Sequence, residues 1–266
     1  MPKLDAFGFA DYSQIELRLL AYYMAVLGDD SMARAFREGK DMHTESAKGA
    51  LRIGHEPSDE ERQVGKTFNY SITYGGGTPT LMRQLGVTYA EARDLLNGFH
   101  DRWPGIRVVQ DSIAAQILSR GFGISLAAAT RQVMQARYKE RQRLFLEAIE
   151  RGGYITTLFG RHLHPESEHK ALNALVQGCA ADLLRFSTVR VARFLREEQL
   201  ESHIVNLIHD EIKFDCVTHE LPVLAMNVPI LMTDGRIEEY VPITVDFEVS
   251  YGSWADKQPY EEGAYV

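Results

Sequence analysis

Asp11 and the pair Asp210-Glu211 are the residues of this chain best suited to carry out a reaction. Asp11 follows a short apolar run, and the pair lies between the apolar runs 204–208 and 212–217. Each carboxylate therefore ends a segment whose composition predicts a β-strand. Carboxylates at the ends of adjacent strands can hold two divalent cations, and such sites transfer phosphoryl groups. The alternative is structural, because Asp at a strand end often forms a turn.

A second group of residues recurs at every fourth position and consists of Arg62, Lys66, Tyr70 and Tyr74. On an α-helix these four side chains share one stripe, about 18 Å long. Its cationic end suits a triphosphate, because Arg offers forked hydrogen bonds and Lys a point charge. Its aromatic end offers a stacking surface for a sugar and base. The alternative is a solvated pair of charges followed by core aromatics.

The elements that must position these residues alternate between strands and helices. Ser58 and Glu61 form a capping-box pattern that predicts the start of the helix running to Tyr74. A hairpin is expected in 153–161 and another around His209. The remaining expected elements are helices at 17–27, 32–38, 43–51, 89–102, 132–151, 171–195 and 222–232 and a strand at 243–249. This order predicts an α+β fold, in which a helical block interrupts an antiparallel sheet.

Composition restricts the class of protein without naming it. The chain has 266 residues, 45% hydrophobic and 25% charged, which is typical of a globular protein. Apolar runs are shorter than a membrane span. The two cysteines lack metal-ligand spacing and suggest no disulfide framework, so we expect the protein in a reducing cytoplasm. The net charge of −8 is concentrated after residue 209, where twelve Asp/Glu and three Lys/Arg give −9. The remainder is near neutral, so a nucleic-acid partner is not excluded.

The segment 132–151 is rich in cations and admits two interpretations. It contains the cations Arg137, Lys139, Arg141 and Arg143 together with the apolar residues Met134, Leu144, Phe145, Ala148 and Ile149. A solvated amphipathic helix explains this pattern, and so does contact with a nucleic-acid backbone.

The acidic clusters and the helical stripe together resemble the motifs of the family A (bacterial polymerase I-like) DNA polymerases. Residues 11–18 are similar to motif A, residues 62–75 to motif B and residues 209–211 to motif C. Residues 39–43 and 173–182 also match segments of the family, in the expected order. The resemblance covers nearly the whole chain and is compatible with a phage type. It implies a polymerase palm interrupted by a mainly helical fingers subdomain.

The resemblance implies metal-dependent nucleotidyl transfer in DNA replication or repair. It assigns catalytic roles to Asp11, Asp210, Glu211 and Lys66. It implies two Mg²⁺ ions, replaceable by Mn²⁺, held by Asp11, Asp210 and the backbone carbonyl of Tyr12. Glu211 is expected to support this metal site without being an obligatory ligand.

The resemblance also implies which residues hold the substrates, dNTPs and primer–template DNA. Glu16 is expected to act as a steric gate that excludes a 2′-hydroxyl group. Tyr at position 70 implies weak discrimination against 2′,3′-dideoxynucleotides. The implied nucleotide-binding residues are Arg62, Lys66, Tyr70, Tyr74, His43, Glu16 and Gln14. The implied DNA-binding residues are Asn173, Gln177, His209 and Arg161.

The resemblance divides the chain into palm (1–21), fingers (22–163) and palm (164–266). An insertion is expected at about 106–151. No segment corresponding to the thumb or to an exonuclease domain is expected in this sequence, so a second polypeptide that supplies thumb and early palm is one expected partner. Three interpretations stay open: a core active alone, a piece of a split phage polymerase, and a non-catalytic DNA-binding fragment.

A single-subunit RNA polymerase is the competing enzyme class. Glu16 argues against it, because a bulky gate rejects ribonucleotides. The expected location is the cytoplasm of a bacterium or of a phage-infected host.

Overall fold

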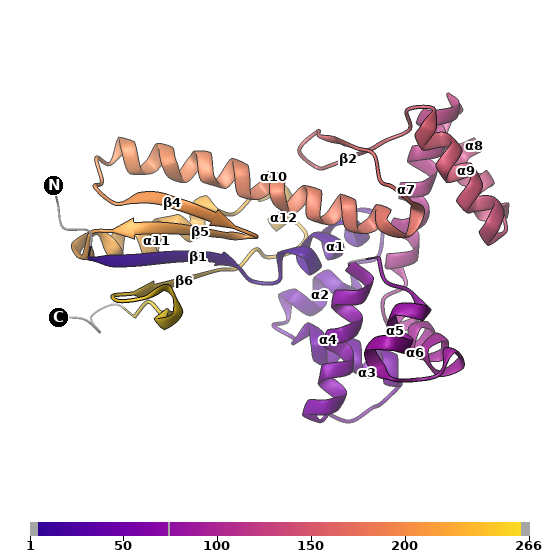
Figure 1. The fold of residues 1–266 in the computed structure, drawn as a ribbon, viewed down its shortest axis with the longest axis horizontal. Helices are drawn as coiled ribbons and strands as arrows, with labels where there is room; N and C mark the ends of the chain where they lie inside the picture. Colours follow the sequence, from indigo (N-terminus) through magenta and orange to yellow (C-terminus); the bar gives the residue numbers. More distant parts are fainter. Residues whose placement is uncertain (1–4, 74, 262–266) are drawn as a thin grey trace. The chain divides into compact units, whose positions relative to one another are not determined.

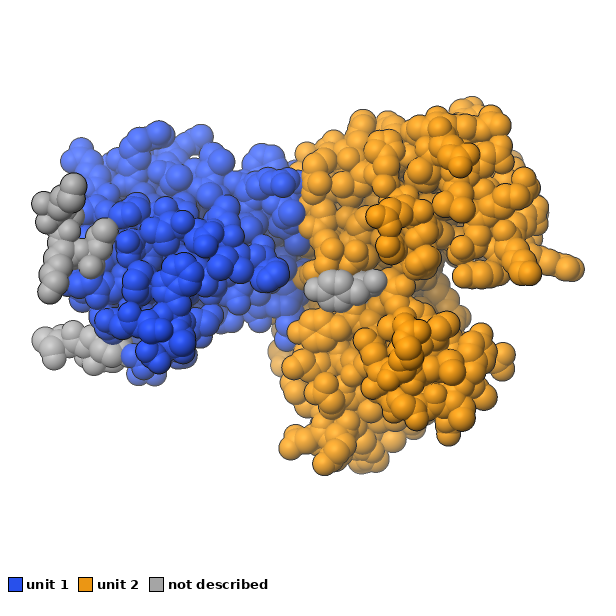
Figure 2. Space-filling model, viewed as in Figure 1, with its two compact units in different colours: residues 1–15, 180–266 blue, residues 16–179 orange. Residues whose placement is uncertain are grey.

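The computed structural model describes residues 5–73 and 75–261. The chain divides into two compact units (Figure 2). Unit 1 comprises residues 1–15 and 180–266, and unit 2 comprises residues 16–179. A sheet with covering helices forms unit 1, whereas unit 2 is mainly helical (Figure 1), so the predicted α+β class is confirmed. The palm and fingers boundaries at residues 21 and 163 stay a prediction.

Unit 1 is built on a five-stranded antiparallel sheet in the order β4-β5-β1-β6-β7. Its first strand, β1, lies between β5 and β6, although both of these strands come much later in the chain. The strands are β1 (Ala6–Tyr12), β4 (His203–Ile208), β5 (Glu211–Cys216), β6 (Val245–Ser250) and β7 (Gln258–Pro259). Short elements η1 (Thr218–Glu220), α12 (Gly235–Glu238) and η2 (Trp254–Asp256) complete the unit with α11 (Leu221–Leu231).

One face of this sheet carries the core of unit 1. Gly8 lies opposite Phe214 and Ala10 opposite Ile212, and both strand partners are fully buried. A Cβ on Gly8 would lie 3.0 Å from the sulfur of Cys216, so the close packing favours glycine here. Because side chains alternate along a strand, Phe9 and Asp11 belong to the opposite face.

Tyr12 joins the core face to the covering helices. Its hydroxyl donates to the carbonyl of Met232, 2.6 Å away, and lies 2.8 Å from Oγ of Ser187. Ser187 belongs to α10 (Glu168–Glu197), whose residues from 180 onward are part of unit 1. The buried hydroxyl therefore has the partners that an apolar environment demands.

Unit 2 consists of helices and one short hairpin. The helices are α1 (Ile15–Val26), α2 (Ser31–Arg37), α3 (Met42–Leu51), α4 (Asp59–Thr73), α5 (Thr78–Leu85), α6 (Tyr89–Arg102), α7 (Gly105–Phe122), α8 (Leu126–Gln135) and α9 (Tyr138–Glu150). The hairpin is β2 (Ile155–Thr156) with β3 (His162–Leu163). Helix α3 packs against α4 and α6, and α7 packs against α8 and α9. None of the helices within 5–73 and 75–261 is long and apolar enough to cross a membrane.

Helix α4 begins with the capping box predicted from the sequence. The amide N–H of Ser58 donates to the carboxylate of Glu61 at 2.8 Å, and the amide N–H of Glu61 donates to Oγ of Ser58 at 3.3 Å. These two bonds satisfy backbone donors that have no partner within the helix.

The single helix predicted for 132–151 is wrong, because α8 ends at Gln135 and α9 begins at Tyr138. Ala136 and Arg137 have extended backbone angles that break the helix. With the break, Val133 of α8 and Phe145 of α9 are both buried, and both helices pack against α7. Burial of two apolar faces outweighs the hydrogen bonds that one continuous helix would retain.

Candidate functional site

Strand register brings carboxylates from three strands to one end of the sheet in unit 1. Asp11 of β1 lies opposite Glu211 of β5 and opposite Asp246 of β6. Residues directly opposite in antiparallel strands project to the same face, so these three share a face. Asp210 occupies the two-residue turn between β4 and β5, next to His209, whose φ of +55° is left-handed. We call this group the acidic end of the sheet.

The surroundings of Asp11 at the acidic end disfavour the charged form of its carboxylate. Burial first, and then repulsion from Asp210 and Glu211, raises its pKa to about 6. Its Oδ1 atom is buried and makes no hydrogen bond to any described residue. The pKa of Asp210 is also raised, again mainly by burial. A buried carboxylate oxygen without a donor is the kind of group that a divalent cation satisfies.

Two lysines occupy both oxygens of Glu211. Lys257 contacts one oxygen at 2.9 Å, and Lys213 contacts the other at 3.0 Å. Lys257 also pairs with Glu248 at 2.6 Å. Burial alone would lower the pKa of Lys257, but hydrogen bonds to Glu248 and Glu211 hold it well above its usual range. Glu211 is thus neutralised by protein cations rather than left open.

The carboxylates of the acidic end fit a cation for which the protein supplies only some of the ligands. The described residues contain no group of three His, Cys, Asp or Glu side chains arranged to hold a metal ion. Asp11 and Asp210 would provide hard oxygen ligands of the kind that suits Mg²⁺, an ion that keeps several waters and often binds through one or two carboxylates and substrate phosphates.

Sequence reasoning missed four charged residues of this region: Lys213, Asp246, Glu248 and Lys257. Only the strand register reveals Asp246, because it lies in an apolar-looking segment far from Asp11 in sequence. Lys213 had a signal, because it lies two residues after Glu211 in a strand and therefore on the same face.

In unit 2, Arg62 of α4 is held by a forked hydrogen bond. Its Nε and Nη2 atoms donate to the two carboxylate oxygens of Asp41, at 2.7 and 3.1 Å. Asp41 also caps α3 by accepting from the amide N–H of Thr44 at 3.0 Å. Partial burial would raise the pKa of Asp41, but the bonds from Arg62 and Thr44 hold it well below its usual range. The pair fixes the direction of the guanidinium group.

His43 is held by a chain of hydrogen bonds from the core. The indole N–H of Trp103 donates to Ser46, 3.1 Å away, and Ser46 donates to the amide oxygen of Asn69 at 2.6 Å. The Asn69 amide nitrogen then lies 3.0 Å from Nδ1 of His43. As an amide N–H can only donate, Nδ1 accepts, and the ring proton is on Nε2. Burial lowers the pKa of His43, so it is a neutral donor.

The close approach of α3 and α4 brings these groups together. A Cβ on Gly65 would lie 2.0 Å from the carbonyl oxygen of His43 and 2.6 Å from the nitrogen of Ala47. Glycine at position 65 is therefore what allows His43 and Arg62 to lie side by side on the packed pair.

The stripe predicted on α4 is present as far as the structure describes it. Arg62, Lys66 and Tyr70 follow at intervals of four along α4, whereas Tyr74 lies outside the described residues. Tyr70 is half exposed, with its ring 6.2 Å from that of His43. Lys66 makes no ion pair with another described residue. We call Arg62, Lys66, His43 and Tyr70 the cationic face of α4.

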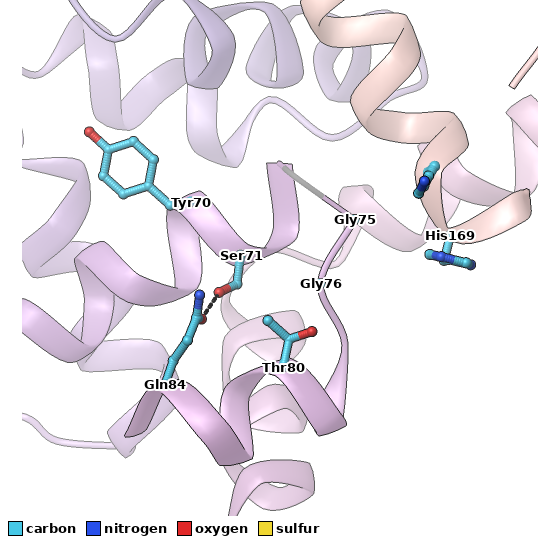
Figure 3. A pocket seen from close by; sticks show the side chains of 8 residues that line it. Tyr70, Ser71, Gly75, Gly76, Thr80, Gln84 and His169 are labelled. Atoms are coloured by element: carbon cyan, nitrogen blue, oxygen red, sulfur yellow. Dashed lines mark hydrogen bonds between the residues drawn. The ribbon is translucent and has the colours of Figure 1, made fainter. Parts of the chain in front are cut away.

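A pocket of about 360 Å³ opens at the tyrosine end of this face (Figure 3). Ser71 donates a short hydrogen bond to Gln84 across it. Gly75 has a φ of +74°, and a Cβ there would lie 2.4 Å from the carbonyl oxygen of His169, so glycine lets the turn pass close to α10. The lining residues are Tyr70, Ser71, Gly75, Gly76, Thr80, Gln84, His169 and Lys170.

The other predicted substrate residues occupy different surroundings. Gln177 donates to the carboxylate of Glu16 at 3.2 Å, which joins the expected steric gate to an expected DNA-binding residue. Gln14 is exposed, with a φ of +54°. Arg161 donates to the carbonyl of Gly178 at 2.6 Å. The roles of these residues, and those of His209 and the Tyr12 carbonyl, stay predictions.

Asn173 adds one more unsatisfied group. Its Nδ2 atom is buried and has no hydrogen-bond partner within the described part of the chain. A buried amide donor without a partner destabilises the folded protein. A ligand that offers a hydrogen-bond acceptor here would remove that cost.

Known proteins resemble this chain along nearly its whole length. A family model for DNA polymerase family A matches residues 2–256. DNA polymerase I of Chloroflexus aurantiacus is 30% identical over 96% of this chain and 24% of its own length. DNA polymerase I of Geobacillus stearothermophilus is 29% identical over 93% of this chain and 26% of its own length. The chain thus spans about a quarter of the length of these curated relatives.

A solved structure agrees with this assignment. The POL domain of Pol1 from M. smegmatis, in complex with DNA primer-template and dNTP, superposes with a TM-score of 0.71 at 25% identity. The match covers 92% of this chain and 39% of that one. The chain belongs to DNA polymerase family A.

Proposed function

We propose that this chain is the nucleotidyl-transfer core of a DNA polymerase, which adds deoxynucleotides to a primer 3′-hydroxyl under the direction of a template. The observation that carries the proposal is the acidic end of the sheet. There, Asp11 lies opposite Glu211 and beside Asp210, with a pKa raised to about 6 and a buried Oδ1 that has no hydrogen-bond partner among residues 5–73 and 75–261. Family membership and the primer-template complex of the structural relative support the same chemistry. In this proposal, unit 1 belongs to the palm (1–21 and 164–266), and unit 2 contains the fingers (22–163).

Asp11 and Asp210, with the backbone carbonyl of Tyr12, would hold the divalent cations. Bound Mg²⁺ supplies the Lewis acidity that activates the attacking hydroxyl and stabilises the leaving pyrophosphate. Glu211 keeps Lys213 and Lys257 beside the carboxylates, which limits the repulsion within the site. It therefore supports the site through the lysines and need not be a ligand.

The cationic face of α4 would bind the nucleotide. Arg62 uses Nε and Nη2 on Asp41, and its other N–H groups, which bond to none of the described residues, would donate to phosphate oxygens. Lys66 adds a positive charge, and His43 adds a neutral Nε2–H donor. Tyr70 offers an exposed ring for the sugar and base. The adjacent pocket, with its hydroxyl and amide groups, is our candidate site for a nucleobase.

Glu16 and Gln177 would select and read the substrates. The hydrogen bond from Gln177 holds the Glu16 carboxylate, which would exclude a 2′-hydroxyl group. Minor-groove acceptors are similar in all base pairs, so amide donors such as Gln177 and Asn173 check pair shape without choosing a sequence.

Primer extension tests the proposal. The purified chain is incubated with a labelled primer–template, dNTPs and Mg²⁺, beside Asp11→Ala and Asp210→Ala variants. We expect incorporation that requires Mg²⁺ or Mn²⁺ and the template, and that each variant loses. Parallel reactions with rNTPs should give no extension, because of Glu16.

Binding measurements separate chemistry from recognition. Mn²⁺ titration followed by electron paramagnetic resonance should detect sites that either alanine variant weakens. Unchanged Mn²⁺ binding in both variants, together with no template-dependent incorporation by the parent chain, would contradict the proposal.

A further inference from the structure

The α8–α9 region departs from the acidic character of the chain. From residue 112 to residue 139 there is no Asp or Glu, although the net charge of the chain is −8. The same 28 residues contain four cations, namely Arg120, Arg131, Arg137 and Lys139. Arg120 is engaged, because it donates to the carbonyl of Tyr154 at 2.7 Å and lies over its ring. The other three are left for another partner.

These three cations are exposed and unpaired. Arg131, Arg137 and Lys139 make no ion pair or side-chain hydrogen bond with any residue in 5–73 and 75–261. Between them, Met134 and Tyr138 are each 74% exposed, the most exposed large apolar side chains described. We call the exposed residues of this stretch, which runs from α8 across the break into α9, the basic platform; it comprises Arg131, Met134, Gln135, Arg137, Tyr138 and Lys139.

The other faces of the two helices anchor the platform. Both α8 and α9 pack against α7 (Figure 1). Arg141 extends from α9 to Asp111 of α7, with 2.6 Å between their charged atoms, and also pairs with Glu168 of α10. The buried residues of these two helices are Ala129, Val133, Phe145 and Ala148. The platform is therefore a fixed surface, and its exposed groups are not needed to hold the helices in place.

We propose that the basic platform binds single-stranded DNA. Its three cations fit the phosphate backbone, the Tyr138 ring provides a stacking surface for a base, and Gln135 provides amide groups for base edges. This combination of charge and one exposed aromatic ring matches an unpaired strand better than a duplex, whose bases are already stacked. The inference goes beyond the proposed function, because the platform lies outside both the acidic end of the sheet and the cationic face of α4.

The test is fluorescence anisotropy with a labelled 20-nucleotide oligo(dT), measured without Mg²⁺ or dNTPs at several salt concentrations. The platform variant is Arg131→Gln/Lys139→Gln. Its matched control is Arg143→Gln/Arg151→Gln, which removes the same charge from α9 and its end, where both arginines pair with Glu147. Tyr138→Ala tests stacking. Thermal melting of all variants checks that they are folded.

We expect the platform variant to raise Kd on the order of tenfold and to reduce the slope of log Kd against log salt by about 1.4, since each single-strand phosphate contributes about 0.7. Tyr138→Ala should raise Kd roughly fivefold or more and leave the slope unchanged. The matched control should leave both quantities near their original values.

Three outcomes would overturn the inference. Equal weakening by the platform variant and the matched control would mean that only total charge matters. An unchanged Kd in the platform variant would place the oligonucleotide elsewhere. Tighter binding of labelled poly-glutamate than of oligo(dT), insensitive to Tyr138→Ala, would assign the platform to an acidic protein segment.

Discussion

The acidic end of the sheet and the cationic face of α4 are two ways of assembling charged residues. At the sheet, carboxylates that are far apart in sequence meet through strand register. On α4, Arg62, Lys66 and Tyr70 come from one helix and follow its period, and His43 joins them from α3. The first arrangement therefore depends on the whole of unit 1 being folded, whereas the second depends on a single helix and its contact with α3.

The two regions also differ in how far their polar groups are satisfied. At the sheet, Asp11 has a pKa of about 6 and a buried oxygen that no described residue contacts by a hydrogen bond. On α4, Arg62 is paired with Asp41, and His43 with Asn69. A cation would neutralise the unsatisfied site, whereas the hydrogen bonds of the satisfied face would orient it before a nucleotide binds.

This comparison predicts different kinetic defects when each region is broken. Asp210→Ala should lower kcat by about 10³-fold or more, because charge stabilisation in the transition state is lost. Arg62→Ala should mainly raise KM for dNTP, by roughly 10-fold to 100-fold, because it removes ground-state binding of phosphates. Steady-state primer extension at varied dNTP concentration measures both constants. Equal falls in kcat with unchanged KM would remove the distinction between the regions.

The contact between α3 and α4 can be broken without touching a charged group. Gly65→Ala places a Cβ 2.0 Å from the His43 carbonyl oxygen, so the helices must separate. We expect the free energy of unfolding to fall by about 2–3 kcal/mol, as for other overpacked interiors. Urea denaturation measures it. Gly54→Ala is the control, because a Cβ there meets nothing within 4 Å and should change stability little.

Local sequence patterns predicted features that lie within a single helix, whereas α5, α7 and α8 were not expected as separate helices. The capping box at Ser58 and the stripe on α4 depend on spacing within one helix, so they are visible in the sequence. Strand register is a long-range property, which is why Asp246 was missed although it lies opposite Asp11. The break at Ala136 was missed for a related reason, because it follows from the packing of α8 and α9 on α7. The approach of Asp11 to the pair Asp210-Glu211 was expected from the residues themselves, because each carboxylate ends a segment whose composition predicts a strand.

The raised pKa of Asp11 predicts how the stability of the protein depends on pH. Its folded-state pKa of about 6 exceeds the ordinary value of 3.8, so the folded protein binds the proton more tightly than the unfolded chain. The stability that this proton provides is complete below pH 4 and is lost as pH rises through 6. Asp11→Asn avoids that loss, and we expect it to raise the free energy of unfolding at pH 7.5 by about 1 kcal/mol, a value reduced for the half-exposed position.

Urea denaturation in EDTA at several pH values between 4 and 8 measures this effect. The difference between Asp11→Asn and the parent protein should grow between pH 4 and 6 and then stay constant. Millimolar Mn²⁺ should stabilise the parent protein and not the variant. If the free energies of unfolding of Asp11→Asn and the parent protein differed by the same amount at every pH, the pKa of Asp11 would not be raised in the folded protein.

A smaller effect is expected at the cationic face of α4, from a change in the Asp41–Arg62 pair. Asp41→Asn retains an oxygen that can cap α3 but weakens the forked bond that orients Arg62. Since Arg62 remains present and only its orientation is loosened, KM for dNTP should rise about threefold to tenfold, less than in Arg62→Ala. Stability at pH 7 should fall by less than about 1 kcal/mol, because the pair is partly exposed. A KM as high as that of Arg62→Ala would mean that Asp41 itself contributes to nucleotide binding, and that the cationic face is less fully arranged in advance than its hydrogen bonds indicate.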